Sequence, residues 1–274
     1  MVNTEKPSFD AYVESILPTL GFKGDVGKAE TAYAFNMRSA LGAAQAEPFT
    51  NVVAALKTIP ESYLGGQPDL LFYSREIAED LNLRVKPFSS VLGKLHRRNV
   101  IFNNKWPSPS KSYVNPANLY SEIDDLLRTR LVCRYLDGPR FVSEHLKQIC
   151  DSLDVVNETR PLSTEAGYYA WHFYFQIPVE LAINGQIDTH PMWCEIQITT
   201  QLAELIAALT HDLYEVRREG AKRDDLWKWM ASSPEFRSSY IGHGLHLLEG
   251  VIQSFRDDVI EDRRTNNNGE GKQE

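Results

Sequence analysis

The first eighty residues alternate between helical patterns and short interruptions. Apolar residues recur three or four positions apart near the N-terminus, and an Ala-rich stretch with few helix breakers covers 32–46. Gly and Pro gather over 60–68 and predict a loop, and the pattern over 70–81 predicts another helix. We therefore expect a helical N-terminal region over residues 1–80. Its sequence contains no recognisable catalytic constellation.

The middle of the chain changes to the two-residue alternation of β-strands. Strands are predicted over 130–136, 168–181 and 192–199. Asn184-Gly185 is a typical hairpin turn between the last two. We expect an α/β protein of the α+β kind, with a mixed, mainly antiparallel sheet of about five strands flanked by helices.

Further helices are predicted from apolar residues at helical spacing. One begins at Pro87, and others cover 141–153, 201–218 and 236–260. In the helix predicted over 201–218 we expect an apolar stripe to face the core, formed by Leu202, Leu205, Ile206, Leu209 and Leu213. The polar end of the chain, 266–274, is predicted to be disordered. The resulting division is an N-terminal helical region (1–80), a core (81–221), a C-terminal helical region (222–265) and the tail.

Composition excludes several classes of protein. The chain has 274 residues, of which 42% are hydrophobic and 24% charged, which is typical of a globular protein rather than a disordered or fibrous one. No apolar run approaches the roughly 20 residues that span a bilayer, and the N-terminus lacks the order of a signal peptide. Three cysteines without metal-type spacing favour reduced thiols. We expect a cytoplasmic protein with no membrane partner.

The charge distribution points to one local site. The net charge is -8, yet Leu81 to Ser121 contains no acid and carries seven basic residues. The sign then reverses at Glu122, Asp124 and Asp125. A basic segment followed by an acidic pair is what a site for phosphate and magnesium needs. A solvated basic face beside a helix cap has the same charges, and charge alone does not separate the two interpretations.

Strand alternation gathers polar side chains on one face of the predicted sheet. Side chains two residues apart share a face, so the polar face collects Arg130, Val132 and Arg134; Tyr168, Ala170, His172, Tyr174 and Gln176; and Glu195, Gln197 and Thr199. Arginines, a carboxylate, a histidine and aromatic rings are the inventory of a nucleotide cleft. An antiparallel sheet with one solvated face shows the same alternation, so the interpretation as a cleft depends on the identity of these residues.

Four segments, in order, resemble the synthetase domain of the RelA/SpoT family. They are Arg84-Val-Lys86 with Ser89, Ser90 and Lys94; Asp125-Leu-Leu-Arg-Thr-Arg130-Leu-Val; Gly167-Tyr168-Tyr-Ala-Trp-His172; and Glu195-Ile-Gln197-Ile-Thr-Thr200. The resemblance covers roughly residues 80–217 and is greatest to the small alarmone synthetases, some of which are toxins. It implies a nucleotidyltransferase-like fold. It also implies a pyrophosphokinase that passes the β,γ-diphosphate of ATP to a ribose 3′-hydroxyl and releases AMP.

The resemblance also implies roles for individual residues. Those assigned to ATP are Arg84, Lys86, Ser89, Lys94 and Arg134; an arginine both grips phosphate and stacks on adenine. Asp125 and Glu195 are assigned to Mg²⁺, a hard cation that takes oxygen ligands, with removal of the hydroxyl proton as an alternative role for Glu195. Arg130 is expected to enter the cleft and Gln197 to orient its surroundings. The residues assigned to the acceptor are Tyr168, His172, His211 and Tyr214.

Each of these side chains also has a purely structural interpretation. Asp125 suits the end of a helix, and Tyr168 and His172 suit the solvated face of a strand. Glu195 is flanked by apolar residues, so a buried carboxylate there needs a partner or an ion. The structural interpretation is therefore weakest for Glu195.

Departures from the family pattern lie on the acceptor side. The segment 160–167 carries an acid and an alanine where lysine and asparagine are usual, and Ala170, Thr199 and Thr210 replace a serine, an arginine and a glutamate. Three functions stay open: synthesis of guanosine tetra- or pentaphosphate from GDP or GTP; a toxin, paired with an antitoxin protein, that modifies the 3′ end of tRNA or makes adenosine alarmones; and an inactive nucleotide-sensing module. Retention of Asp125 and Glu195 disfavours the third.

Overall fold

A computed structural model defines the fold. It describes residues 5–20, 26–73, 81–111, 113–218 and 225–270, with the side chains of 15, 16, 19, 20, 210–218, 225 and 266–270 left out. The helices are α1 (Phe9–Ala11), α2 (Val26–Ala43), α3 (Phe49–Leu56), α5 (Phe88–His96), α6 (Leu119–Glu122), α7 (Gly138–Ser152), α8 (Gln201–Arg218) and α9 (Pro234–Glu270). Short 3₁₀ or π segments are η1 (Tyr12–Ile16), η2 (Leu17–Leu20), η3 (Ile59–Gly65), η4 (Pro68–Leu70), η5 (Arg97–Ile101) and η6 (Asp225–Trp229).

A five-stranded sheet organises the molecule. Its strands are β1 (Arg84–Val85), β2 (Leu127–Cys133), β3 (Asn157–Ser163), β4 (Tyr169–Ile183) and β5 (Gln186–Thr200). The order across the sheet is β1-β2-β5-β4-β3. Only β2 and β5 pair in parallel, and the other neighbours are antiparallel. The expected mixed, mainly antiparallel sheet of an α+β protein is confirmed.

The long hairpin β4–β5 forms where the sequence predicts it. Asn184 and Gly185 both have positive φ, 54° and 83°, which are the backbone angles that a two-residue hairpin turn of type I′ requires. Asparagine and glycine adopt this conformation at little strain. Both strands extend beyond the predicted ranges, since the pairing continues from Trp171 with Ile198 to Ile183 with Gln186.

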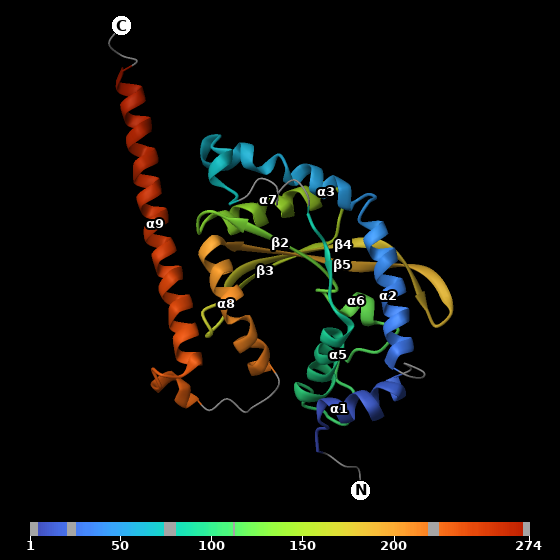
Figure 1. Ribbon diagram of the computed structural model, residues 1–274. Helices are drawn as coiled ribbons and strands as arrows, with labels where there is room; N and C mark the ends of the chain where they lie inside the picture. Colours follow the sequence, from blue (N-terminus) through green and yellow to red (C-terminus); the bar gives the residue numbers. More distant parts are fainter. Residues whose placement is uncertain (1–4, 21–25, 74–80, 112, 219–224, 271–274) are drawn as a thin grey trace.

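One face of the sheet forms the core. Phe173, Phe175 and Ile196 are fully buried there, and Figure 1 shows α3 and α7 over this side of the sheet. Alternation along β4 and β5 therefore sorts side chains as predicted, with apolar residues inward and polar residues on the opposite face. The helices α5 and α8 lie on that opposite side of the sheet in Figure 1.

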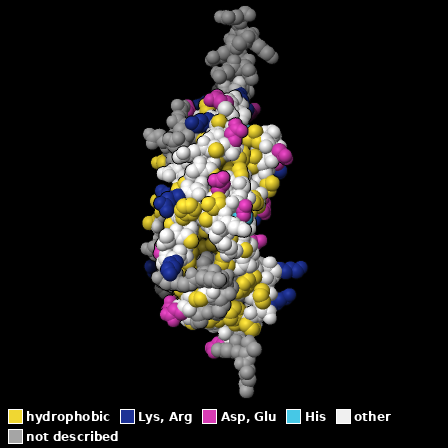
Figure 2. Space-filling view, turned by 90° about the vertical axis from the view of Figure 1, so that its right-hand side faces the viewer, with side chains coloured by type: hydrophobic (Ala, Val, Ile, Leu, Met, Phe, Trp, Pro, Cys, Tyr) yellow, Lys and Arg dark blue, Asp and Glu magenta, His cyan; other side chains and the backbone are white. Residues whose placement is uncertain are grey.

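The helix α2 covers the far end of the hairpin at the side of the molecule. Asn36, 1% exposed, holds the two together. Its amide nitrogen donates to the Tyr120 hydroxyl and the Ala182 carbonyl, and its amide oxygen accepts from the Ala182 N–H. Figure 2 turns this side towards the viewer, where hydrophobic and charged side chains are interspersed.

Strand β3 was absent from the predicted elements. It is an edge strand with largely exposed side chains, and it contains Pro161. Proline is tolerated at an edge because its missing N–H removes no bond inside the sheet. A strand exposed on both sides lacks the hydrophobic alternation by which β2, β4 and β5 were recognised. The two-residue strand β1 is too short to give a pattern.

Three expectations about the helices need correction. The first is the helix predicted over 70–81. The Tyr73 N–H donates to the Val132 carbonyl, and Phe72 forms a β-bridge with Cys133, so 71–73 run beside β2 instead of forming a helix. Residues 74–80 lie outside the described residues. The helix predicted from Pro87 starts at Phe88, with Pro87 as the extended residue before it. The stripe on α8 does not join the core, because Leu205 and Leu209 are 55% and 70% exposed.

Helix α9 is the longest element and lies along the outside of the molecule (Figure 1). It continues to Glu270, into the segment 266–274 for which disorder was expected; 271–274 lie outside the described residues. Among the helices described, none combines the length and hydropathy needed to cross a membrane. The three cysteines Cys133, Cys150 and Cys194 are free and buried.

Replacing Asn36 by alanine should lower the free energy of unfolding by about 1–3 kcal/mol, because the peptide groups of Ala182 would lose their buried partners. Urea denaturation measures this change. Arg38→Ala, at an exposed position of the same helix, should change the value by no more than about 0.5 kcal/mol. Equal effects of the two substitutions would show that Asn36 does not hold α2 to the hairpin.

Candidate active site

The sheet register aligns polar residues in two rows across the open face. Laterally paired positions share a face, so each row brings side chains from distant segments together. The first row contains Arg84, Arg128, Glu195, Tyr174 and Glu158. The second contains Arg130, Gln197, His172 and Arg160. The residues predicted on β2, β4 and β5 are therefore neighbours in space, and β1 and β3 add further charges at both edges.

Glu195 is buried at the centre of the first row, with its side chain 3% exposed. Its Oε1 accepts from His172 Nδ1 at 2.7 Å and from the Tyr174 hydroxyl at 3.0 Å, and Oε2 accepts from Gln197 Nε2 at 2.9 Å. These donors stabilise a carboxylate away from water. Burial, followed by the charge of Glu195, raises the pKa of Tyr174, so its hydroxyl keeps the proton that it donates.

His172 connects Glu195 to Tyr168. With Nδ1 donating to the carboxylate, Nε2 is the acceptor for the Tyr168 hydroxyl, 3.1 Å away. The two rings meet edge to face, with centroids 6.2 Å apart. Tyr168 is half-buried at the start of β4, just beyond the turn that follows β3. A chain of hydrogen bonds thus runs from an aromatic ring at the sheet edge to a buried carboxylate.

Asp125 forms the centre of a second cluster, two residues before β2. Lys86 donates to its Oδ2 at 2.7 Å and Lys94 to its Oδ1 at 2.8 Å. Burial alone would raise the pKa of Asp125, but the charges and hydrogen bonds of the two lysines outweigh it and lower the pKa to about 2. Lys86 is 4% exposed, and its own pKa is lowered by burial. This cluster combines a permanent anion with two cations supplied by β1 and α5.

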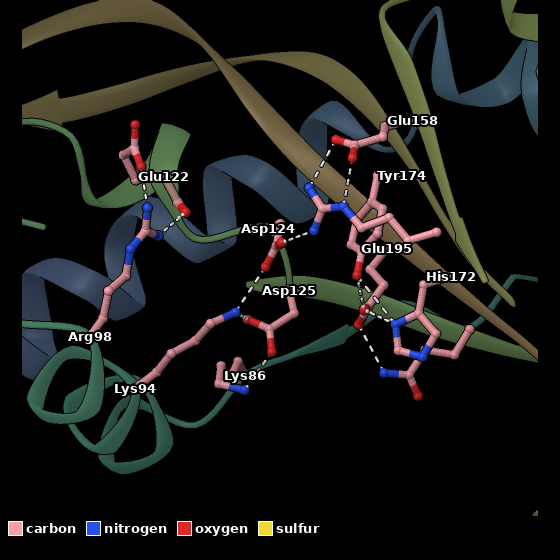
Figure 3. Close-up of polar contacts among 12 residues, drawn as sticks. Lys86, Lys94, Arg98, Glu122, Asp124, Asp125, Glu158, His172, Tyr174 and Glu195 are labelled. Carbon is pink, nitrogen blue, oxygen red and sulfur yellow. Dashed lines mark hydrogen bonds and ion pairs between the residues drawn. The ribbon is translucent and has the colours of Figure 1, made fainter. Parts of the chain in front are cut away.

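Arg160 bridges the cluster around Asp125 and the cluster around Glu195. Figure 3 shows both clusters, with Asp125 and Glu195 labelled. One of its nitrogens donates to Asp124 at 2.6 Å, and the others bind Glu158. Its guanidinium also lies 4.5 Å from the centre of the Tyr174 ring, within the range of a cation–π interaction. Since Asp124 also accepts from Lys94, ionic contacts continue from the Asp125 cluster to the residues around Glu195.

The two arginines Arg84 and Arg128 differ from the other cations of the face. They are lateral partners on β1 and β2, and within the described part of the chain neither has a hydrogen-bonding or ion-pair partner. Arg128 is half-buried, and its charge contributes to lowering the pKa of Lys86. Adjacent unneutralised guanidinium groups repel each other and are stabilised when an anion binds between them.

The donor set fits a magnesium ion that binds together with phosphate. Among the described residues no three acidic, histidine or cysteine side chains form a metal site. Mg²⁺ is usually held by one or two carboxylates, with waters and substrate phosphates completing the shell. Asp125 remains ionised, because its pKa is lowered to about 2, and both of its oxygens accept from lysines. Glu195 is a further carboxylate on this face, buried among its own three donors.

Some predicted residues lie elsewhere. Arg130 binds Glu204 of α8 at 2.6 and 2.7 Å and Gln197 at 3.2 Å, so it connects the face to α8. Arg134 follows β2 and donates to the Phe72 carbonyl, which places it apart from the Lys86 cluster. Ser89 is exposed in the first turn of α5. His211 and Tyr214 fall in α8, where side chains are not described.

Five residues of this network have no role assigned from the sequence: Arg128, Tyr174, Asp124, Glu158 and Arg160. Alternation places Tyr174 on the polar face, and Arg128 has the same strand parity as Arg130, so alternation is a usable signal for both. Asp124 stands next to Asp125 and was read as part of an acidic pair without a role of its own. Arg160 had no signal, because β3 was not predicted.

No protein-family model and no curated protein matches the sequence. Solved structures similar to this chain include small alarmone synthetase 1 from Bacillus subtilis, with 20% identity over 66% of this chain and 80% of that chain and a TM-score of 0.45. Small alarmone synthetase 2 from the same organism has 17% identity over 86% of this chain and 100% of that chain, with a TM-score of 0.46. A GTP pyrophosphokinase family protein from Streptococcus pneumoniae has 20% identity over 66% of this chain and 76% of that chain, with a TM-score of 0.43.

The lowered pKa of Asp125 predicts a pH dependence of stability. Its contribution is present above the usual value of 3.8 and is lost as the pH falls towards about 2. Urea unfolding of the wild type and of Asp125→Asn should therefore differ more at pH 7 than at pH 3. Asp188→Asn, at an exposed position, serves as the control. A difference for Asp125→Asn that is the same at both pH values would contradict the proposed ion pairs.

Proposed function

We propose that the protein is a cytoplasmic pyrophosphokinase that transfers the β,γ-diphosphate of ATP to the 3′-hydroxyl of GDP or GTP and releases AMP. The observation that carries this proposal is the continuity of the polar face. A cationic cluster around Asp125 is joined through Asp124, Arg160 and Tyr174 to the buried carboxylate of Glu195 and its partners. Donor, reacting centre and acceptor then occupy successive positions along one face.

The cationic end suits the triphosphate. Transfer of a phosphoryl group depends on positioning and on stabilising the charge of the transferred group. Among the described residues aligned on this face, Arg84 and Arg128 are cations without a hydrogen-bonding or ion-pair partner, and Lys86 and Lys94 both contact Asp125 nearby. In the proposed complex these four side chains bind phosphate oxygens. A magnesium ion held by Asp125 would neutralise charge on the transferred diphosphate.

The acceptor end suits a nucleoside. The ring of Tyr168 would stack on the base, an interaction worth about 1–3 kcal/mol. His172, which accepts from Tyr168 and donates to Glu195, would then lie next to the ribose. Glu195 is the proposed acceptor of the 3′-hydroxyl proton, because it is the carboxylate at the end of this hydrogen-bond chain. Tyr174 and Gln197 hold its oxygens in place.

The order of the four sequence segments supports this reaction independently of the geometry. Arg84 to Lys94, Asp125 to Arg130, Tyr168 to His172 and Glu195 to Gln197 resemble the RelA/SpoT synthetase pattern, and all four segments contribute residues to the same face. On the acceptor side, Arg160 lies over the Tyr174 ring, and Asp124 and Glu158 already neutralise its charge.

A transfer assay tests the proposed reaction. ATP labelled in the γ-phosphate is incubated with GDP, GTP, unlabelled ATP or deacylated tRNA, with Mg²⁺ present. Label should enter GDP or GTP, and Asp125→Asn and Glu195→Gln should each lower the rate at least about 100-fold. Glu144→Gln, an exposed carboxylate on α7, should leave the rate unchanged. Label in RNA, or in an adenosine nucleotide that carries the diphosphate on its 3′-hydroxyl, would instead assign a toxin-type acceptor, and transfer to none of them would leave a nucleotide-sensing role.

Tyr168→Ala should weaken acceptor use more than ATP use. Loss of stacking is expected to raise the acceptor KM about 10-fold or more, while the KM for ATP changes less than about twofold. Tyr168→Phe keeps the ring and removes only the hydroxyl that reaches His172, so it should retain most of the acceptor affinity. Steady-state kinetics with each substrate varied in turn measure both. Equal increases in the two KM values would show that Tyr168 does not bind the acceptor.

A further inference from the structure

Tyr168 follows directly from a tight turn that joins β3 to β4. The Gly167 N–H donates to the Thr164 carbonyl at 2.9 Å, and the Thr164 N–H donates to the Tyr168 carbonyl at 3.0 Å. Gly167 has a φ of 77°, a conformation that favours glycine. The position of the Tyr168 ring therefore depends on where this turn, residues 164–168, is held.

The first half of α9 holds the turn from behind. Ser239 Oγ donates to the Glu165 carbonyl, and His243 Nε2 lies 3.2 Å from the same oxygen. On its other side, His243 Nδ1 is 2.7 Å from the Tyr169 hydroxyl. The tautomer with the proton on Nε2 satisfies both contacts, donating to the carbonyl and accepting from the tyrosine. Two residues of α9 thus fix both ends of the segment 165–169.

The backbone of the turn at Gly167 lies in direct contact with the backbone of α9 at Gly242. A Cβ added to Gly242 would lie 2.5 Å from the Gly167 carbonyl oxygen, and one added to Gly167 would lie 2.5 Å from the Ser239 carbonyl oxygen. Real side chains do not tolerate such distances, so this approach requires glycine on both sides. In contrast, a Cβ added to Gly244, one position beyond His243, would meet no atom within 4 Å.

Helix α9 is itself held to the rest of the molecule by residues C-terminal to His243. Glu249, 6% exposed, is buried beside Thr200 and the backbone of Leu202 and Ala203 in the first turn of α8. Arg256 binds both oxygens of Asp137 at 3.0 Å and lies over the Tyr135 ring. These anchors keep α9 from shifting along the sheet edge, so its first half provides a rigid support for the turn.

We propose that α9 positions Tyr168 for the acceptor, with Ser239, Gly242 and His243 as the positioning residues. The inference rests on the proposed function, in which Tyr168 stacks on the acceptor base. The turn 164–168 has no core of its own, and Glu165 is exposed. Its bonds to α9 therefore replace the packing that fixes the other site residues on β2, β4 and β5. A displacement of the turn by even about 1 Å would misplace the ring and lower the rate of transfer.

Gly242→Ala and Gly244→Ala form a matched pair that tests the proposal. Both substitutions favour the helical backbone by a similar amount, but only the first introduces a Cβ against Gly167. Gly242→Ala should raise the KM for the acceptor about 10-fold and leave that for ATP within about twofold. Gly244→Ala should match the wild type in both. Thermal unfolding establishes that each variant is folded.

Amide hydrogen exchange without nucleotides gives a readout that does not require activity. Gly242→Ala should speed exchange in 164–168, and Ser239→Ala, which removes one hydrogen bond without a clash, should do so to a smaller extent. If Gly242→Ala behaves like Gly244→Ala in exchange or in acceptor KM, the proposal is wrong. If the wild type transfers diphosphate to no acceptor, the proposed function fails, while exchange still decides whether α9 holds the turn.

Discussion

The burial of Glu195 is the constraint on which the arrangement of the polar face depends. A carboxylate 3% exposed requires donors, and these come from neighbouring positions in the register: His172 and Tyr174 on β4 and Gln197 two residues along β5. Each donor is in turn fixed by the pairing of β4 with β5. The sheet therefore determines the geometry of Glu195 before any ligand binds, as preorganised catalysis requires.

The charges at the other end of the face are arranged differently. Lys86, Lys94 and Arg160 are matched by Asp125, Asp124 and Glu158 in direct ion pairs. Arg84 and Arg128 are left without such partners among the described residues. The first set keeps the cluster ordered in the free protein, while the second set supplies the excess positive charge that attracts a polyanion. In the proposed complex, this division would let a protein of net charge -8 bind ATP at one place.

Periodicity predicted the parts of the site that lie on long, half-buried strands. The alternation in β4 and β5 identified Tyr168, His172, Glu195 and Gln197 as sharing a face, because one side of those strands is buried in the core. The same method did not find Arg160, since an edge strand with both sides exposed has no such pattern. It also assigned the stripe of α8 to the core: spacing shows that apolar residues share a side of a helix but not what that side contacts.

The proposed reaction requires the residues of the Asp125 cluster to exchange ion-pair partners. This exchange leaves no buried charge unpaired. Lys86 and Lys94 are held by carboxylate oxygens in the free protein and would be held by phosphate oxygens in the complex. Asp125 would in turn replace two ammonium groups with a divalent cation. Each buried charge is then paired with an opposite charge both before and after the nucleotide binds, so none is buried without a partner. Glu195 keeps its three donors throughout and remains available to accept a proton.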